Sequence, residues 1–194
     1  LRSPDASALA TTAYAPDAAD DLTNRDSNHQ QYVSPPLTAQ TLSGNVTAQF
    51  QCLEELANCN LFLTLKILAC NRAGGSTVAT LLAITRATSL ELGTTISNRT
   101  FPSTALSSFA CALGDRLVVE VGLAGNITSG TGGNVGHNGS IRWGGAATGG
   151  DLPINETETG ATFRPWIEFS STFAFEFTGE DTNMVIARTR FVQW

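Results

Sequence analysis

Gly114-Asp115-Arg116-Leu117-Val118-Val119-Glu120-Val121-Gly122 indicates most clearly how this chain folds, because it reads as a tight turn that leads into a buried strand. A second run of the same kind, Pro165-Trp166-Ile167-Glu168-Phe169-Ser170, occurs nearer the C-terminus. Both runs place polar side chains at defined positions among apolar ones. Apolar runs bounded by Gly and Pro in this way are typical of the inner strands of a two-sheet β-sandwich.

The chain beyond its first 34 residues carries further strand patterns. Residues 46–52 alternate between apolar and polar side chains, which is the period of a half-buried strand. We expect further strands at 61–70 and 77–85, a long strand from Trp166 towards Phe177, and a last strand at 184–192. Gly turns separate several of these segments.

We expect a loop before residue 105, because Gly93 and the Phe101-Pro102 pair interrupt the strand pattern. Helical segments do not alternate with the strands, which disfavours a parallel α/β fold. About eight or nine strands at this spacing fit a sandwich or jelly roll. The sequence therefore predicts an all-β fold, a two-sheet antiparallel β-sandwich that is jelly-roll-like, with an extended N-terminal arm.

The composition excludes several classes of partner. Hydrophobic residues make up 42% of the chain, which is enough for a sizeable core, but charged residues make up only 14%. The formal net charge is -6 and Lys66 is the sole lysine, so no basic surface is available to grip nucleic acid. The longest apolar runs fall far short of the roughly 20 residues that span a bilayer. We therefore expect no nucleic acid and no membrane as partners.

We predict three parts: an extended arm at 1–34, the sandwich at 35–178 and a C-terminal strand or tail at 179–194. The arm is rich in Ala, Asp, Asn and Pro and sustains no apolar period, so it cannot form a core of its own. It docks on a neighbouring subunit or on its own sandwich, and we favour the neighbour. The candidate partner-binding anchors are Leu9, Tyr14, Leu22, Tyr32 and Trp194.

Local motifs for catalysis are missing from the sequence. No Gly-x-Ser-x-Gly elbow and no phosphate-binding Gly-x4-Gly-Lys loop occurs. The two histidines lie in the arm (His29) and in a glycine-rich segment (His137), where neither is expected to be a rigidly held base. Glu120 and Glu168 interrupt apolar strands, and we expect them to face solvent or to pair with arginines, namely Arg116, Arg142 or Arg164. We identify no catalytic and no cofactor-binding residue.

Metal binding is also disfavoured. The four cysteines contain no Cys-x-x-Cys pair, and we interpret Cys52, Cys70 and Cys111 as buried thiols, with one disulfide as the alternative. The acidic loop that carries Asp151, Glu156 and Glu158 has oxygen ligands suited to calcium. We favour a solvated loop, and we assign no metal site and no cofactor.

The strands resemble a domain common in virion proteins of tailed bacteriophages. The resemblance covers about residues 36–175. It rests on the stretch from Thr38 to Cys52, on the Gly114–Gly122 strand, on Ile141-Arg142-Trp143-Gly144, on Asp151-Leu152-Pro153 and on the Pro165–Ser170 strand. It implies a jelly-roll-like sandwich used in capsid decoration, head fibres or tail structures, without enzymatic activity. Phage proteins assemble in a reducing cytoplasm, which agrees with free thiols.

The function expected from the resemblance is therefore that of a virion structural protein. We expect a capsid decoration (cement) subunit, a homo-oligomer assembled in the host cytoplasm, which binds capsid or other virion proteins through its arm and sandwich edges. The alternative is a carbohydrate-binding or receptor-binding module of a phage tail or fibre. In that case Trp143 is the candidate sugar-binding residue, because exposed aromatic rings stack on sugars.

Overall fold

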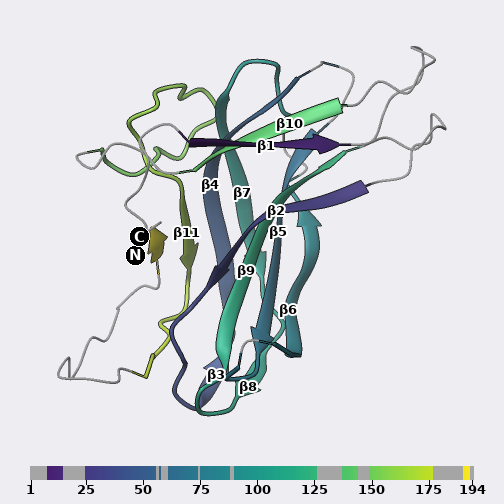
Figure 1. The fold of residues 1–194 in the computed structure, drawn as a ribbon. Coiled ribbons are helices and arrows are strands. Elements are labelled where there is room, and N and C mark those ends of the chain that lie inside the picture. The colour runs from purple at the N-terminus through teal and green to yellow at the C-terminus, as the bar shows by residue number, and fades with distance from the viewer. Residues whose placement is uncertain are drawn as a thin grey trace.

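The computed structural model describes residues 8–14, 25–55, 57, 61–73, 75–87, 90–125, 137–143, 149–176 and 190–192, with the backbone alone at 8–14, 25–30, 137–138, 143 and 190–192. These residues form strands and no helix (Figure 1). In chain order the strands are β1 Ala8–Tyr14, β2 Arg25–Val33, β3 Gln40–Leu42, β4 Asn45–Glu54, β5 Leu61–Cys70, β6 Thr77–Arg86, β7 Ser97–Ala105, β8 Phe109–Cys111, β9 Arg116–Gly125, β10 His137–Trp143, β11 Trp166–Phe169 and β12 Arg190–Val192.

Two main sheets face each other, and every pair of these strands is antiparallel. One sheet has the order β1-β10-β4-β11-β12, with β7 paired to β4, and the other has the order β2-β9-β5-β6. Strands β3 and β8 form a small third sheet at the end of the molecule opposite β1 and β10 (Figure 1). The prediction of an all-β antiparallel sandwich is confirmed.

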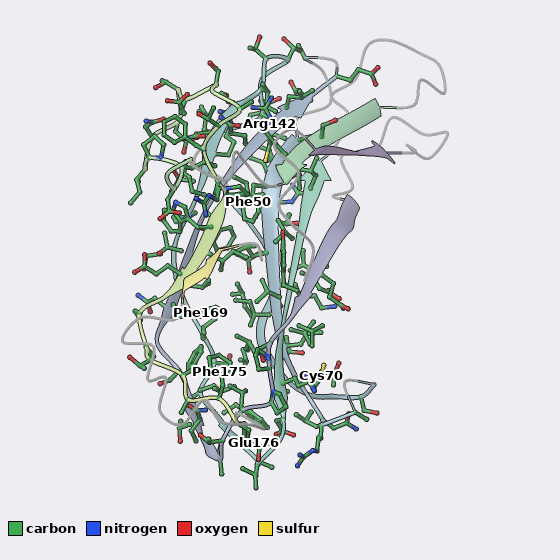
Figure 2. The ribbon with its side chains drawn as sticks, turned by 60° about the vertical axis from the view of Figure 1, so that its left-hand side comes forward. Phe50, Cys70, Arg142, Phe169, Phe175 and Glu176 are labelled. Atoms are coloured by element: carbon green, nitrogen blue, oxygen red, sulfur yellow. The ribbon has the colours of Figure 1, made fainter. Side chains whose placement is uncertain are left out.

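The core lies between the two main sheets and consists of alternate side chains of their strands. On β4, Val46, Ala48, Phe50 and Cys52 are at most 1% exposed, as the alternation in the sequence predicts. Figure 2 shows Phe50, Phe169 and Phe175 at successive heights along the sandwich. On β5 the inward residues are likewise buried, namely Leu61, Leu63, Leu65, Ile67 and Ala69.

Two strand predictions are wrong. Residues 97–105 form β7, where a loop was expected. Pro102 is tolerated there because β7 pairs with β4 alone, and the register shifts beside Pro102, so its missing N–H breaks no ladder. Strand β11 ends at Phe169 and does not continue towards Phe177, although Phe173 and Phe175 still pack into the core.

The N-terminal segment contributes one strand to each main sheet. Strand β1 pairs with β10 along its whole length, and β2 pairs with β9 from Arg25 to Val33. The sequence favoured docking on a neighbouring subunit, and for these two strands that expectation is wrong, because both pair with strands of the chain's own sandwich. Ser34 extends the attachment, since its N–H donates to Leu117 O at 2.9 Å and its Oγ accepts from Leu117 N at 2.9 Å.

Candidate functional site

A long loop, which we call the strap (residues 149–164), covers the outer face of β4 and β7. Its two ends are joined by main-chain hydrogen bonds, with Leu152 N donating to Arg164 O and Arg164 N donating to Gly150 O, both at 2.9 Å. Trp166 follows the strap in β11, and its Nε1 donates to Leu152 O at 2.8 Å. The strap is therefore a closed loop with its ends fixed to each other.

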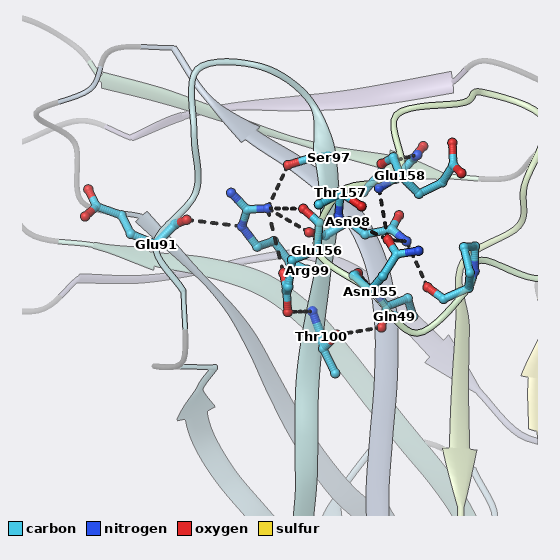
Figure 3. Close-up of polar contacts among 12 residues, drawn as sticks. Gln49, Glu91, Ser97, Asn98, Arg99, Thr100, Asn155, Glu156, Thr157 and Glu158 are labelled. Carbon is cyan, nitrogen blue, oxygen red and sulfur yellow. Dashed lines mark hydrogen bonds and ion pairs between the residues drawn. The ribbon is translucent and has the colours of Figure 1, made fainter.

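Side-chain amides of the sheet hold the main chain of the strap (Figure 3). Gln49, Gln51 and Asn98 are each at most 1% exposed, and their NH2 groups point into the strap. A buried peptide carbonyl must accept a hydrogen bond, and in a sheet the donor is usually an N–H of the neighbouring strand. Here the side-chain amides are the donors. The bonds run from Gln49 Nε2 to Asn155 O at 2.7 Å, from Gln51 Nε2 to Glu158 O and Gly160 O at 3.1 Å each, and from Asn98 Nδ2 to Pro153 O at 2.9 Å.

Arg99 is the charged side chain at the centre of the contact between the strap and β7. Its side chain is 7% exposed and lies 3.7 Å from Glu156 of the strap, measured from Nη1 to Oε2. Nε donates to Glu91 O at 3.1 Å, and Nη1 donates to Ser97 Oγ and to Asn98 O at 2.7 Å each. The guanidinium thus connects β7, the strap and the segment before β7.

The glutamates of the strap accept hydrogen bonds from main-chain N–H groups. Glu156 Oε1 accepts from Thr100 N at 3.0 Å, and Glu158 Oε1 accepts from Gly160 N. Both residues are half-buried, so the expectation of a solvated acidic loop is wrong for them, while Asp151 is exposed. Within the residues that the structure describes, no group of three or more His, Cys, Asp or Glu side chains is placed to hold a metal ion.

An Asx turn stiffens the tip of the strap. Asn155 Oδ1 accepts from Thr157 N at 3.0 Å, from Glu158 N at 2.9 Å and from Asn98 Nδ2 at 3.2 Å. The neighbouring Ile154 is 71% exposed, the most exposed of the large apolar residues described. The tip of the strap therefore presents an exposed apolar side chain on a loop that hydrogen bonds hold along its length.

The partner-binding anchors predicted from the sequence are not brought together by the described structure. Leu9 and Tyr14 lie in β1, described by its backbone, and Leu22 and Trp194 lie outside the described residues. Tyr32 is half-buried against the main core, and burial raises the pKa of its phenol. A partner contact through Tyr32 is therefore limited to the part of the ring that this packing leaves exposed.

Trp143, the sugar-binding candidate, is the last residue of β10 and pairs with Ala8 of β1. The preceding residue, Arg142, reaches the strap: its Nη1 donates to Gln51 Oε1 at 2.7 Å and to Thr159 O at 3.4 Å. Burial lowers the pKa of Arg142. The end of β10 therefore lies beside the strap, with the Trp143 ring outside what the structure describes.

The cysteine prediction is confirmed for three residues. Cys52, Cys70 and Cys111 are buried free thiols, and burial raises the pKa of Cys52 and of Cys111. Cys59 lies outside the described residues.

The partner expected for Glu120 is corrected. Its Oε2 lies 3.0 Å from Nζ of Lys66, a basic residue that was not among the partners expected from the sequence, because Lys66 of β5 is directly opposite Glu120 in the register with β9. Gln31 Nε2 of β2 also donates to Glu120 Oε1 at 3.0 Å. Both contacts lie on the outer face of the four-stranded sheet, so Glu120 ties its strands together.

Sequence reasoning missed the residues that hold the strap, Gln49, Gln51, Asn98 and Arg99. On β4, Gln49 and Gln51 occupy the polar phase of the alternation and are normally read as solvent-facing. The signal that was present is their type, since amides rather than charged groups occupy both positions in a chain otherwise rich in Thr and Ser.

The fold and site together define an antiparallel β-sandwich protein with a rigid surface loop, and the described residues contain no helix of the length and hydropathy needed to span a bilayer. No family model and no curated protein matches the sequence.

Two solved virus structures are similar at a low level. The structure of infectious bursal disease virus Gx strain is 14% identical with a TM-score of 0.29, and the match covers 84% of this chain and 35% of that one. The infectious bursal disease virus VP2 subviral particle is 12% identical with a TM-score of 0.25, covering 86% of this chain and 36% of that one. The chain thus spans about a third of the length of these proteins, and likeness at this level does not identify a function.

Proposed function

We propose that this protein is a non-enzymatic structural subunit of a viral particle and that it works by adhering to other protein subunits. One observation carries the proposal: the N-terminal segment joins the sandwich by main-chain strand pairing, β1 on β10 and β2 on β9. Strand addition of this kind needs only an open sheet edge on the receiving partner, so it serves equally well between neighbouring subunits.

The finer proposal is a capsid decoration subunit of a bacteriophage, located in the virion and present as a homo-oligomer. Leu9, Tyr14, Leu22, Tyr32 and Trp194 are the proposed contacts to capsid or sister subunits. Each contact contributes modest binding, and many copies act together, so that the shell is held by multivalent association. The low proportion of charged residues supports protein contacts of this kind, because few charges must be desolvated.

The strap supplies a second proposed contact. Ile154 is held on a loop that is fixed at both ends and along its length by side chains of β4 and β7. A rigid apolar anchor binds a partner at low cost in conformational entropy, because little order is lost on binding.

The alternative is a carbohydrate-binding or receptor-binding module, with Trp143 as the sugar-stacking residue. The observation in its favour is the bond between Arg142 and Thr159 O, which places the end of β10 beside a rigid loop. Sugar sites are commonly built where a fixed loop adjoins an aromatic side chain.

The test replaces apolar anchors of the arm by charged residues in the full-length chain. Leu9→Asp with Tyr14→Asp is co-expressed with the other structural proteins of the particle, and incorporation is measured by sedimentation and gel densitometry. Leu113→Asp is the matched control, because Leu113 is 59% exposed and lies on the turn before β9. We expect the arm variant to fold but to be lost from particles, while the control is retained.

Retention of the arm variant at the wild-type copy number would overturn the adhesive role of the arm. Binding of the purified protein on a glycan array, lost on Trp143→Ala, would establish the alternative instead.

A further inference from the structure

Glu54, the last residue of β4, ties three segments of the chain together. It is 2% exposed. Its N–H donates to Gly93 O at 3.0 Å, and its Oε2 accepts from Leu61 N, the first residue of β5, at 3.2 Å. In the sheet it is directly opposite Gly139 of β10. We call this arrangement of Glu54, Leu61 and Gly93 the Glu54 joint.

The surroundings of this carboxyl suit its neutral form. A carboxylate has room for about four hydrogen bonds, and the Leu61 N–H is the donor that the described residues supply to it. The charged groups that act on it are Glu91, which repels a second negative charge, and Arg99, which attracts one. Arg99 already donates to four oxygen atoms and faces the Glu156 carboxylate, so its charge is largely compensated.

We propose that protonation of Glu54 controls how firmly the Glu54 joint holds this end of the sandwich together. The joint is closed when the carboxyl is neutral and loosened when it ionises. The physical reason is that a buried, poorly solvated negative charge is relieved by admitting water. The carboxylate keeps the Leu61 N–H as a donor, but the water that solvates the charge opens the packing around Glu54 and weakens the bond from its N–H to Gly93 O.

The consequence reaches the N-terminal strands. Strand β10 pairs with β4 through Gln51 to Glu54 only, and β1 is attached to the sandwich through β10. If the Glu54 joint loosens, the short β4–β10 ladder is weakened at one end. This ladder holds both β10 and β1 on the sandwich. This inference does not depend on the proposed function, because it concerns how the chain holds its own strands.

The pH range follows from the environment. Burial, with a smaller contribution from Glu91, raises the pKa of Glu54 from 4.5 to about 7, while the Leu61 N–H and Arg99 oppose the rise. The folded protein thus binds this proton more tightly than the unfolded chain. Stability contributed by the neutral carboxyl is lost as the pH rises from about 4.5 to about 7 and changes little above that.

The experiment is an NMR titration of the full-length protein from about pH 4 to about pH 9. The Glu54 carboxyl carbon and the Leu61 amide are followed, and thermal melting is measured over the same range. We expect both signals to titrate together with a midpoint near pH 7. The melting temperature should fall as the pH rises from about 4.5 to about 7. Glu91→Gln should lower the midpoint, because it removes the repelling charge.

Glu54→Gln is the informative variant, since it keeps the shape and stays neutral. It should abolish the titration of the Leu61 amide and flatten the melting curve against pH, while Glu55→Gln, at an exposed neighbouring position, should change neither. A Leu61 amide that does not titrate in wild-type protein would overturn the proposal, whether or not Glu54→Gln folds. An equal effect of Glu55→Gln would overturn it as well.

Discussion

Arg99 on β7 and Glu156 in the strap face each other where the loop meets the sheet, with 3.7 Å between Nη1 and Oε2. The arginine is 7% exposed and the glutamate 30% exposed, so the pair is mostly shielded from solvent. Arg99 also donates to the main-chain oxygens of Glu91 and Asn98. The residue therefore connects the strap to β7 and to the segment just before β7.

Replacing Arg99 by Met removes this connection at nearly constant volume. Glu156 then keeps a charge without its partner, and two buried carbonyls lose a donor. We expect the free energy of unfolding, measured by urea denaturation, to fall by about 3 kcal/mol.

Arg72→Met is the matched control for that substitution. Arg72 pairs with Glu176 at 3.7 Å. Its side chain is 65% exposed, so water replaces the guanidinium, and we expect a smaller loss than for Arg99→Met although Glu176 is 19% exposed. Equal losses in the two variants would contradict the structural role given to Arg99.

Gln51→Leu tests how the sheet holds the strap. The change removes the donor to Glu158 O and Gly160 O and the acceptor for Arg142 Nη1. Each buried group left without a partner costs about 1–3 kcal/mol. We expect lower stability in urea and faster protease cleavage within 149–164.

The control is Gln31→Leu, because the bond from Gln31 to Glu120 is exposed and we expect less than about 1 kcal/mol there. Unchanged cleavage of the strap in Gln51→Leu would show that the amide does not hold it.

The strands that the sequence predicted correctly are those whose pattern is visible in their own residues. Inward-facing residues of β4 and β5 recur with a period of two, and β9 is an apolar run that follows a Gly turn. Strand β6 was also expected, although two register shifts against β5 turn both Leu81 and Leu82 inward.

Strand β7 and the strap could not be predicted, because their environment is created by contacts distant in sequence. Asn98 and Arg99 are polar, yet they are buried beneath a loop that follows more than fifty residues later. The end of β11 was missed for a similar reason: Phe173 and Phe175 are core residues of an irregular segment. Because both residues are apolar, the sequence predicts that the strand beginning at Trp166 continues through them.

Gly114→Ala is expected to destabilise the turn that precedes β9. Gly114 has φ of +91°, and a Cβ there would lie 3.0 Å from Arg72 Cδ. Because the left-handed region is unfavourable for alanine, we expect a loss of about 1–2 kcal/mol in the free energy of unfolding.

Gly75→Ala is the control for backbone strain, since nothing lies within 4 Å of the added Cβ. We expect a change within about 0.5 kcal/mol in either direction. A neutral effect of Gly114→Ala in thermal melting would contradict the turn geometry.

Phe169→Ala tests the core between the sheets. Phe169, labelled in Figure 2, is fully buried. Its ring centroid lies 5.2 Å from that of Phe173. The substitution leaves a cavity, and we expect a loss of about 3–5 kcal/mol. Leu113→Ala, at a position 59% exposed, should cost less than about 1 kcal/mol in the same denaturant titration.

We propose that this chain is a repeated structural subunit of a viral particle. Electron cryomicroscopy of the native particle tests it most directly. We expect density for the two-sheet sandwich at every equivalent position of a regular lattice, with the N-terminal segment or the strap in contact with a neighbouring subunit. Particles that lack this density, together with a chain that sediments as a free monomer, would contradict it.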